Sequence, residues 1–245
     1  MMRSDPSAGP RKRGPYLFFL ALLVLSPGLV GAQESPPGSP LSGGDNQDVC
    51  DALDALHCAV DAMDEEDPNR KKAEKALDAA LKAKKGKKNP DTGQYETRLR
   101  KKTLERKGHD AFTTPEADDG KKVSGTEAVG EGNEFVVLGD KWLGGSGSAA
   151  NASLAGLLAH EGVRLTQKYS YPRKGQSFKD KCGIVNRSLD AWGVHIAVLE
   201  ALAGKETDPD EKKKIEDRIK DAEAAKDSWQ KHKDALNKQQ PGGCK

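Results

Sequence analysis

Apolar residues recur every three or four positions in five segments of this chain, a spacing that commits most of it to amphipathic helices. The segments cover about residues 48–63, 68–85, 149–169, 188–203 and 208–236. Asp48 is the expected N-cap of the first helix, and Pro68 and Pro209 are expected in the first turns of the second and the last. The sequence therefore predicts an N-terminal helical hairpin and a long C-terminal helix.

Strand signals are few. The clearest is Glu134–Asp140, which reads EFVVLGD and combines β-branched and aromatic residues. Residues 94–103 alternate well enough to suggest a second strand, whereas Thr113–Gly132 are rich in Gly, Asp and Glu and are expected to form a loop. The predicted fold class is therefore α+β, mainly helical, with a small sheet.

Charge and hydropathy exclude two classes of protein. Residues 1–32 hold four Lys or Arg and one Asp, so their removal changes the formal charge of the chain from +2 to −1. That balance argues against a basic nucleic-acid-binding protein. Outside the N-terminus there is no uncharged apolar run of the length of a membrane span, which argues against a polytopic membrane protein.

The N-terminus has the pattern of a secretory signal. Arg11, Lys12 and Arg13 precede an apolar run from Tyr16 to Leu25, and small residues at 30 and 32 favour cleavage before Gln33. The alternative is an uncleaved N-terminal anchor. We expect a signal peptide over 1–32, a disordered Pro/Gly/Ser linker over 33–46, a single domain over 47–238 and a tail over 239–245. The expected compartment is periplasmic or extracellular, in a bacterium.

The even number of cysteines favours disulfides in an exported chain. Cys50 and Cys58 lie eight residues apart on one predicted helix, about 12 Å along its axis. That distance is too long for a disulfide between them. With all four cysteines paired, two connectivities remain, and we favour Cys58–Cys182 with Cys50–Cys244. Free thiols are the alternative.

One segment points to catalytic chemistry. Leu157–Gln167 reads LLAHEGVRLTQ, on the predicted helix 149–169 that follows the strand 134–140 and a glycine-rich turn. In a His-Glu-x-x-His helix, the two imidazoles bind one zinc ion and the glutamate activates the zinc-bound water. Residues 133–203 resemble zincin-type metallopeptidases whose third zinc ligand is a Glu on the next helix.

The resemblance implies roles for particular residues. His160 matches the first zinc ligand and Glu161 the catalytic base, and the strand 134–140 matches the sheet edge that lines the substrate cleft. Arg164 stands at the position of the second histidine, and Ser188 aligns with the third ligand. Arginine has no lone pair to donate and stays protonated, so two of the three expected ligands are missing.

Two interpretations of these departures stay open. Arg164 replaces the positive charge of zinc beside Glu161, or forms an ordinary helical ion pair with it. Alternatively, a rebuilt metal site uses His160, His195 and Asp190, which are suitable ligand types. The obstacle is that Asp190 and His195 are separated by about 140° around a helix.

Three hypotheses of function follow. The first is a secreted zincin-like domain that has lost its metal and acts as a binding or structural module, with no cofactor. The second is an active zinc-dependent peptidase or hydrolase with atypical ligands. The third is an unrelated helical protein of the cell envelope. We expect a polypeptide or envelope partner, no nucleic acid, and no membrane after signal cleavage, with the oligomeric state left open.

Overall fold

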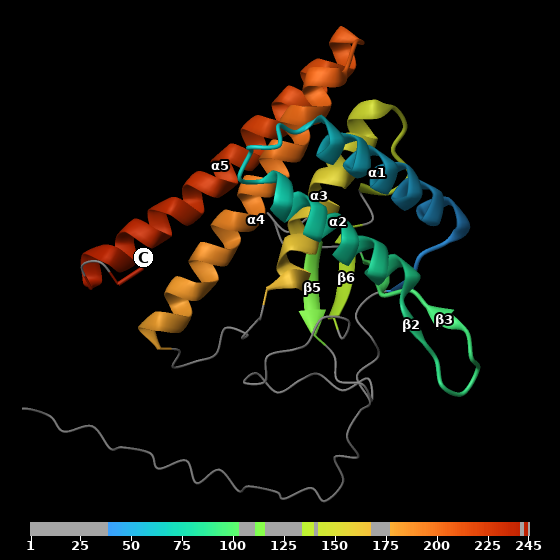
Figure 1. The fold of residues 1–245 in the computed structure, drawn as a ribbon, viewed down its shortest axis with the longest axis horizontal. Coiled ribbons are helices and arrows are strands. Elements are labelled where there is room, and N and C mark those ends of the chain that lie inside the picture. Colours follow the sequence, from blue (N-terminus) through green and yellow to red (C-terminus); the bar gives the residue numbers. More distant parts are fainter. Residues whose placement is uncertain are drawn as a thin grey trace, which may run out of the picture. The chain divides into compact units, whose positions relative to one another are not determined.

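Five helices dominate the part of the chain that the computed structural model describes (Figure 1). The described residues are 39–102, 111–115, 134–139, 142–167, 177–240 and 243–244. By its contacts the chain divides after Gln33, and all of these residues belong to the unit Glu34–Lys245. The predicted signal peptide lies outside the described residues.

The mainly helical α+β prediction is confirmed. The helices are α1 (Gly43–Ala62), α2 (Arg70–Lys85), α3 (Ser148–Thr166), α4 (Phe178–Lys205) and α5 (Pro209–Gln239). Asp208 caps α5, accepting hydrogen bonds from the backbone of residues 210 and 211. Gly86 ends α2 with a φ of 76°, a conformation that glycine adopts at little cost. None of the described helices has both the length and the apolar stretch needed to cross a bilayer.

The first helix begins earlier than its predicted cap. Ser42, rather than Asp48, is the N-cap, and it forms a capping box with Asp45. Leu41 is buried just before it, and Ser39–Pro40 already form a short strand, β1. The expected disordered linker over 33–46 is therefore structured from Ser39 onward, because capping and one buried leucine tie this segment to the domain.

The fourth helix also begins before its predicted start. α4 starts at Phe178, after the N-cap Ser177, whose hydroxyl oxygen accepts a hydrogen bond from the backbone of Asp180. Phe178, Cys182 and Val185 continue the helical spacing toward the N-terminus. Within α2, the first residue is Arg70, so Pro68 lies before the helix and not in its first turn.

The strands form a four-stranded sheet in the order β1-β4-β6-β5 and a two-stranded hairpin. Their bounds are β2 (Lys87–Lys88), β3 (Tyr95–Glu96), β4 (Leu99–Lys102), β5 (Ala111–Pro115) and β6 (Glu134–Gly139). β2 and β3 make the hairpin, and the predicted strand 94–103 is thus broken in two. β4 runs parallel to β6, whereas β5 runs antiparallel to it.

The predicted strand 134–140 is confirmed as β6, but its expected place at the edge of the sheet is wrong. β6 pairs with β4 on one side and β5 on the other. A nearly continuous apolar run predicts burial of the faces of a strand but does not show whether the strand lies at the edge of its sheet. The edge strand that contacts α3 is β5, part of which was expected to be loop.

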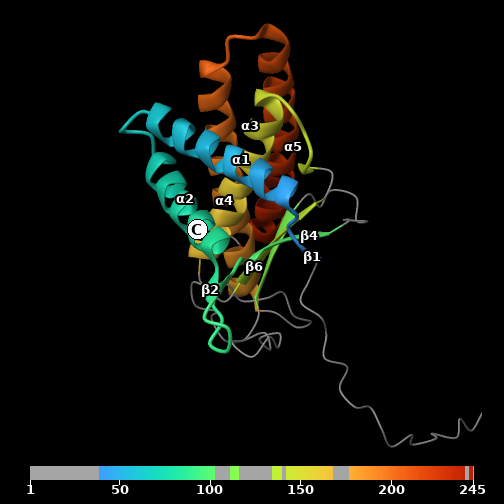
Figure 2. The ribbon, with the colours of Figure 1, turned by 90° about the vertical axis from the view of Figure 1, so that its right-hand side faces the viewer.

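α3 is the central helix of the unit. It contacts the α1–α2 hairpin, α4 and β5, while α5 packs along α4 (Figures 1 and 2). The main core joins α1, α2, α3, α4 and the sheet, and a smaller apolar cluster around Ile215 joins α3, α4 and α5. The first four residues of the HEGVR segment are thus buried inside the protein, and Arg164 is half-buried.

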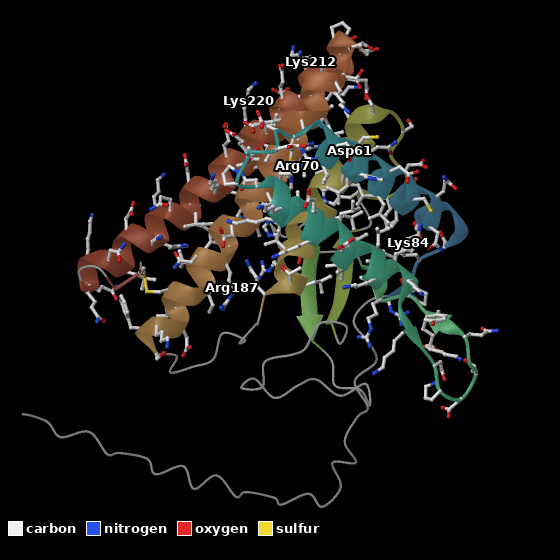
Figure 3. The ribbon with its side chains drawn as sticks, viewed as in Figure 1. Asp61, Arg70, Lys84, Arg187, Lys212 and Lys220 are labelled. Atoms are coloured by element: carbon white, nitrogen blue, oxygen red, sulfur yellow. A yellow bond between two sulfur atoms is a disulfide. The ribbon has the colours of Figure 1, made fainter. Side chains whose placement is uncertain are left out.

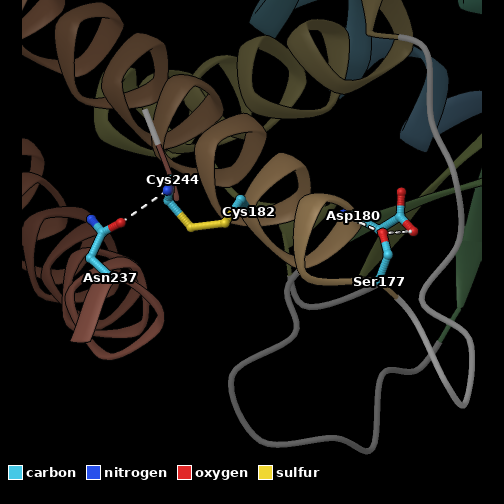
Figure 4. The surroundings of a disulfide bond; sticks show 5 residues. All are labelled: Ser177, Asp180, Cys182, Asn237 and Cys244. Carbon is cyan, nitrogen blue, oxygen red and sulfur yellow. Dashed lines mark hydrogen bonds between the residues drawn. A yellow bond between two sulfur atoms is a disulfide. The ribbon is translucent and has the colours of Figure 1, made fainter. Parts of the chain in front are cut away.

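A disulfide joins the C-terminal tail to the start of α4. Cys182 pairs with Cys244, and the Cys244 backbone donates a hydrogen bond to Asn237 on α5 (Figure 4). Cys50 and Cys58 are free thiols. The favoured pairing was wrong because it assumed that all four cysteines pair, although the exclusion of a Cys50–Cys58 bond is confirmed.

Candidate functional site

Close helix packing positions the histidine and glutamate of the HEGVR segment. A side chain at Gly162 would lie 2.4 Å from the Ala76 carbonyl oxygen of α2, and one at Gly156 would lie 2.7 Å from Nε2 of His195. Both glycines therefore let α3 approach its neighbours closely. His160 and Glu161 are buried as a result, at 5% and 2% exposure.

His160 belongs to an aromatic cluster between α3 and α4, formed by His160, Trp192 and His195. The rings of His160 and Trp192 meet in a T-shaped arrangement with centroids 4.5 Å apart, and Trp192 stacks on His195 at 5.1 Å. The two imidazole centroids are 6.0 Å apart. Both histidines therefore have an indole packed against them, an arrangement typical of aromatic packing in a core.

The surroundings of His160 keep it neutral. Burial is the main cause that holds the pKa of its imidazole well below 6.5, and the neighbouring His195 and Arg164 lower it further. Arg164 is half-buried one helical turn after His160. The same positive charge that disfavours a proton on His160 also disfavours a metal cation there. Among the described residues, Nδ1 of His160 has no hydrogen-bond partner.

The residues considered as metal ligands do not all lie around one point. His160 and His195 come together, but the Asp190 carboxylate binds Lys72 of α2 at 2.7 Å and is 46% exposed. Ser188 is buried and offers only a hydroxyl. Across the described ranges, no group of three His, Cys, Asp or Glu side chains could hold a metal ion. With Arg164 in place of a histidine, this donor set does not fit the zinc of a zincin.

A pocket opens at the outer edge of the aromatic cluster. Its volume is about 210 Å³, and its lining includes Trp142, Trp192, His195 and Arg218. An adjoining pocket of about 250 Å³ shares Trp142, Ser153 and Arg218 with it. We call the two together the Trp142 groove, which runs between α3 and α5.

Arg218 lies across this groove. Its guanidinium lies 4.7 Å from the centre of the Trp142 ring, a cation–π contact, and its Nη1 is 3.5 Å from the Asp221 carboxylate. The Ser153 hydroxyl donates to the Ala149 carbonyl oxygen and is therefore satisfied within α3. The groove thus combines indole surface with two cations, Lys214 and Arg218, and two carboxylates, Glu211 and Asp221.

Sequence reasoning did not find the Trp142 groove. Trp192 was in a predicted helical stripe and His195 was considered as a ligand, but Trp142 and Arg218 come from segments far apart in the chain. Arg218 is one of many charged residues on α5, and no local spacing distinguishes it. Only the packing of α5 against α4 and α3 brings these side chains together.

No protein-family model matches the chain, and neither a curated protein nor a solved structure is significantly similar to it.

Proposed function

We propose that the unit Glu34–Lys245 is a catalytically inactive, zincin-like domain that acts outside the cytoplasm as a polypeptide-binding module. The observation that carries this proposal is the position of Trp192, whose ring packs against both His160 and His195. In a zinc hydrolase the imidazoles would converge on the metal and leave space for water and substrate. Here an indole takes that space.

The charges around the cluster support the same conclusion. Arg164 contributes a fixed positive charge next to His160, whose pKa is lowered by burial, by His195 and by Arg164. A neutral, buried imidazole beside a fixed cation is a poor start for a zinc site but a stable part of a core. The disulfide between Cys182 and Cys244 supports an oxidising compartment, as export would provide.

The Trp142 groove is the proposed binding site. Tryptophan and arginine are the residue types that contribute most to protein interfaces, and here Trp142 and Arg218 lie against each other at its rim. Its size suits one or two inserted apolar or aromatic side chains of a partner chain. Asp221 and Arg218 supply opposite charges for the polar groups of that chain.

Selection of peptides on the immobilised unit tests this function. We expect a displayed peptide library to yield sequences with a shared aromatic or aliphatic residue, whose binding falls at least about tenfold in Trp142→Ala and in Arg218→Ala. Trp229→Ala is the matched control, because Trp229 lies on α5 against His232 and does not line the groove.

Two results would contradict the proposal. The first is enriched peptides that bind all three variants equally, or no enrichment at all. The second is peptide hydrolysis by the wild-type protein with added zinc that disappears in Glu161→Gln, which would restore the hypothesis of an active hydrolase.

A further inference from the structure

Charge is strongly segregated along the first half of the described chain. Residues 43–69, which include α1, hold nine Asp or Glu and no Lys or Arg, a formal charge of −9. Residues 70–102 hold thirteen Lys or Arg and four Asp or Glu, a formal charge of +9. An ordinary solvated surface mixes positive and negative side chains. A segment in which one sign of charge predominates so strongly therefore needs an explanation.

The basic block contains an exposed surface that also carries apolar side chains. We call it the hairpin surface and define it as the end of α2 and the adjoining hairpin, with Leu81, Lys82, Lys85, Lys87, Lys88 and Tyr95. The only exposed large apolar side chains among the described residues are Leu81 and Tyr95, at 45% and 57% exposure. Both lie on this surface, and all four lysines are exposed.

The hairpin surface is held in a fixed geometry. The Lys85 ammonium lies 5.2 Å from the centre of the Tyr95 ring. Gly86 sits directly beneath the Glu96 carbonyl, where a side chain would not fit, and the Arg98 backbone donates a hydrogen bond to the last turn of α2 at Ala83. The hairpin β2–β3 therefore extends from the end of α2 and projects from the helical body (Figures 1 and 2).

Helix stability explains only part of this arrangement. Lysines in the last turn of α2 interact favourably with the partial negative charge at a helix C-terminus. That effect does not require Lys87 and Lys88 beyond the helix. Nor does it account for a leucine and a tyrosine left in water, which marks an interaction site.

We propose that the hairpin surface docks the domain onto a bilayer that contains anionic phospholipids. Clustered lysines are attracted to anionic headgroups, tyrosine is favoured at the headgroup level, and leucine enters the acyl boundary. A soluble polyanion would use the charge but not the two apolar side chains. This docking needs no membrane-spanning segment, and it departs from the expectation that the chain has no membrane partner after signal cleavage.

The proposal is independent of the Trp142 groove. The groove is built from α3, α4, α5 and Trp142, whereas the hairpin surface belongs to α2 and the strands that follow it. Failure of the Trp142 groove to bind peptides would therefore not contradict docking of the hairpin surface onto a bilayer. Failure of the hairpin surface to bind vesicles would likewise not contradict peptide binding in the groove.

Vesicle co-sedimentation of residues 34–245 tests the proposal, because this unit lacks the apolar N-terminal run. We expect binding to vesicles of phosphatidylcholine mixed with phosphatidylglycerol and little binding to phosphatidylcholine alone. Lys85→Glu/Lys87→Glu/Lys88→Glu should reduce partitioning at least about 100-fold, since each lysine near such a surface contributes roughly fivefold. The matched control is Lys212→Glu/Lys213→Glu/Lys220→Glu on α5, which makes the same charge change away from Lys84 and the hairpin (Figure 3).

A second variant separates a bilayer from a soluble polyanion. Leu81→Ser/Tyr95→Ser should weaken binding to the anionic vesicles but not retention on a heparin column, and circular dichroism should show unchanged folding for every variant. The proposal is overturned by absence of binding to the anionic vesicles. It is equally overturned by equal losses in the two lysine variants, or by full vesicle binding of the Leu81/Tyr95 variant.

Discussion

α3 and α5 are both amphipathic helices in the sequence, yet the fold uses them in opposite ways. Fourteen of the nineteen residues of α3 are buried, whereas in α5 only Ile215 and Ala222 of thirty-one residues are buried. α3 has neighbours on several sides, and α5 packs mainly along α4. His160 and Glu161 are therefore core residues, whereas the groove beside them is bounded by α5, which has few buried residues.

The largest expected effect comes from emptying the core around α3. Leu158 is 1% exposed, so Leu158→Ala should lower the free energy of unfolding by about 2–5 kcal/mol. Leu236→Ala removes the same atoms from a half-buried position on α5 and should cost about 1 kcal/mol or less. Urea unfolding of both variants measures the difference. Equal losses would show that α5 shares the core to the same extent as α3.

The disulfide compensates for the small core of α5. The Cys182–Cys244 bond closes a loop with a sequence separation of 62 and fastens the tail after α5 to α4. Cys244→Ser should therefore cost about 2–4 kcal/mol in thermal or urea unfolding. Cys58→Ser, at an exposed free thiol of α1, is the control and should change little. A Cys244→Ser variant as stable as the wild type would mean that helix packing alone holds α5.

Glycine in α3 should behave differently from glycine on an open helix face. Gly162→Ala forces its new methyl group against the Ala76 carbonyl oxygen and should cost about 1–3 kcal/mol. Gly204→Ala in α4 meets no atom within 4 Å and should stabilise the protein by about 0.4–1 kcal/mol. Melting temperatures that move in the same direction for both variants would contradict the claim that Gly162 is needed for the close contact between α3 and α2.

Buried neutral His160 should make stability depend on pH. Its folded-state pKa lies well below 6.5, so below pH 6.5 the unfolded chain binds a proton that the folded chain does not. The contribution of His160 is thus fully present above pH 6.5 and is lost as the pH falls below it. In His160→Gln the slope of unfolding free energy between pH 7 and pH 5 should become shallower. The exposed His57→Gln of α1 is the matched histidine control, and a slope unchanged in His160→Gln would contradict the assignment.

The sequence predicts where the helices lie, but it does not predict which other elements pack around them. A helical stripe reports one apolar face, which located all five helices, but it does not report how many other elements will cover the remaining faces. The clearest case is β6, whose apolar run was recognised while its interior place in the sheet depends on β4 and β5 pairing on both sides. The predicted disulfide pairing was wrong for a related reason, since the spacing of cysteines cannot show that two of them remain free.

The candidate site shows the same limit. The helical positions of Asp190 and His195 predicted that their side chains would point in different directions. In the structure Asp190 binds Lys72 and does not join the two histidines. That Trp192 would pack against both imidazoles could not be derived from spacing, because it depends on the distance between α3 and α4. That distance is set by Gly156, which lies against His195.

The most direct test of the central claim is the zinc content of residues 34–245, prepared without a histidine tag, with the disulfide formed and after dialysis against zinc. We predict far less than one zinc ion per chain, with no difference between the wild type and His160→Ala. We further predict that Arg164→His/Ser188→Glu/Trp192→Ala, which restores the ligand types of a zincin and removes the indole, raises the zinc content toward about one per chain. About one zinc ion per wild-type chain, lost in His160→Ala, would contradict the claim that an aromatic cluster has replaced a metal site.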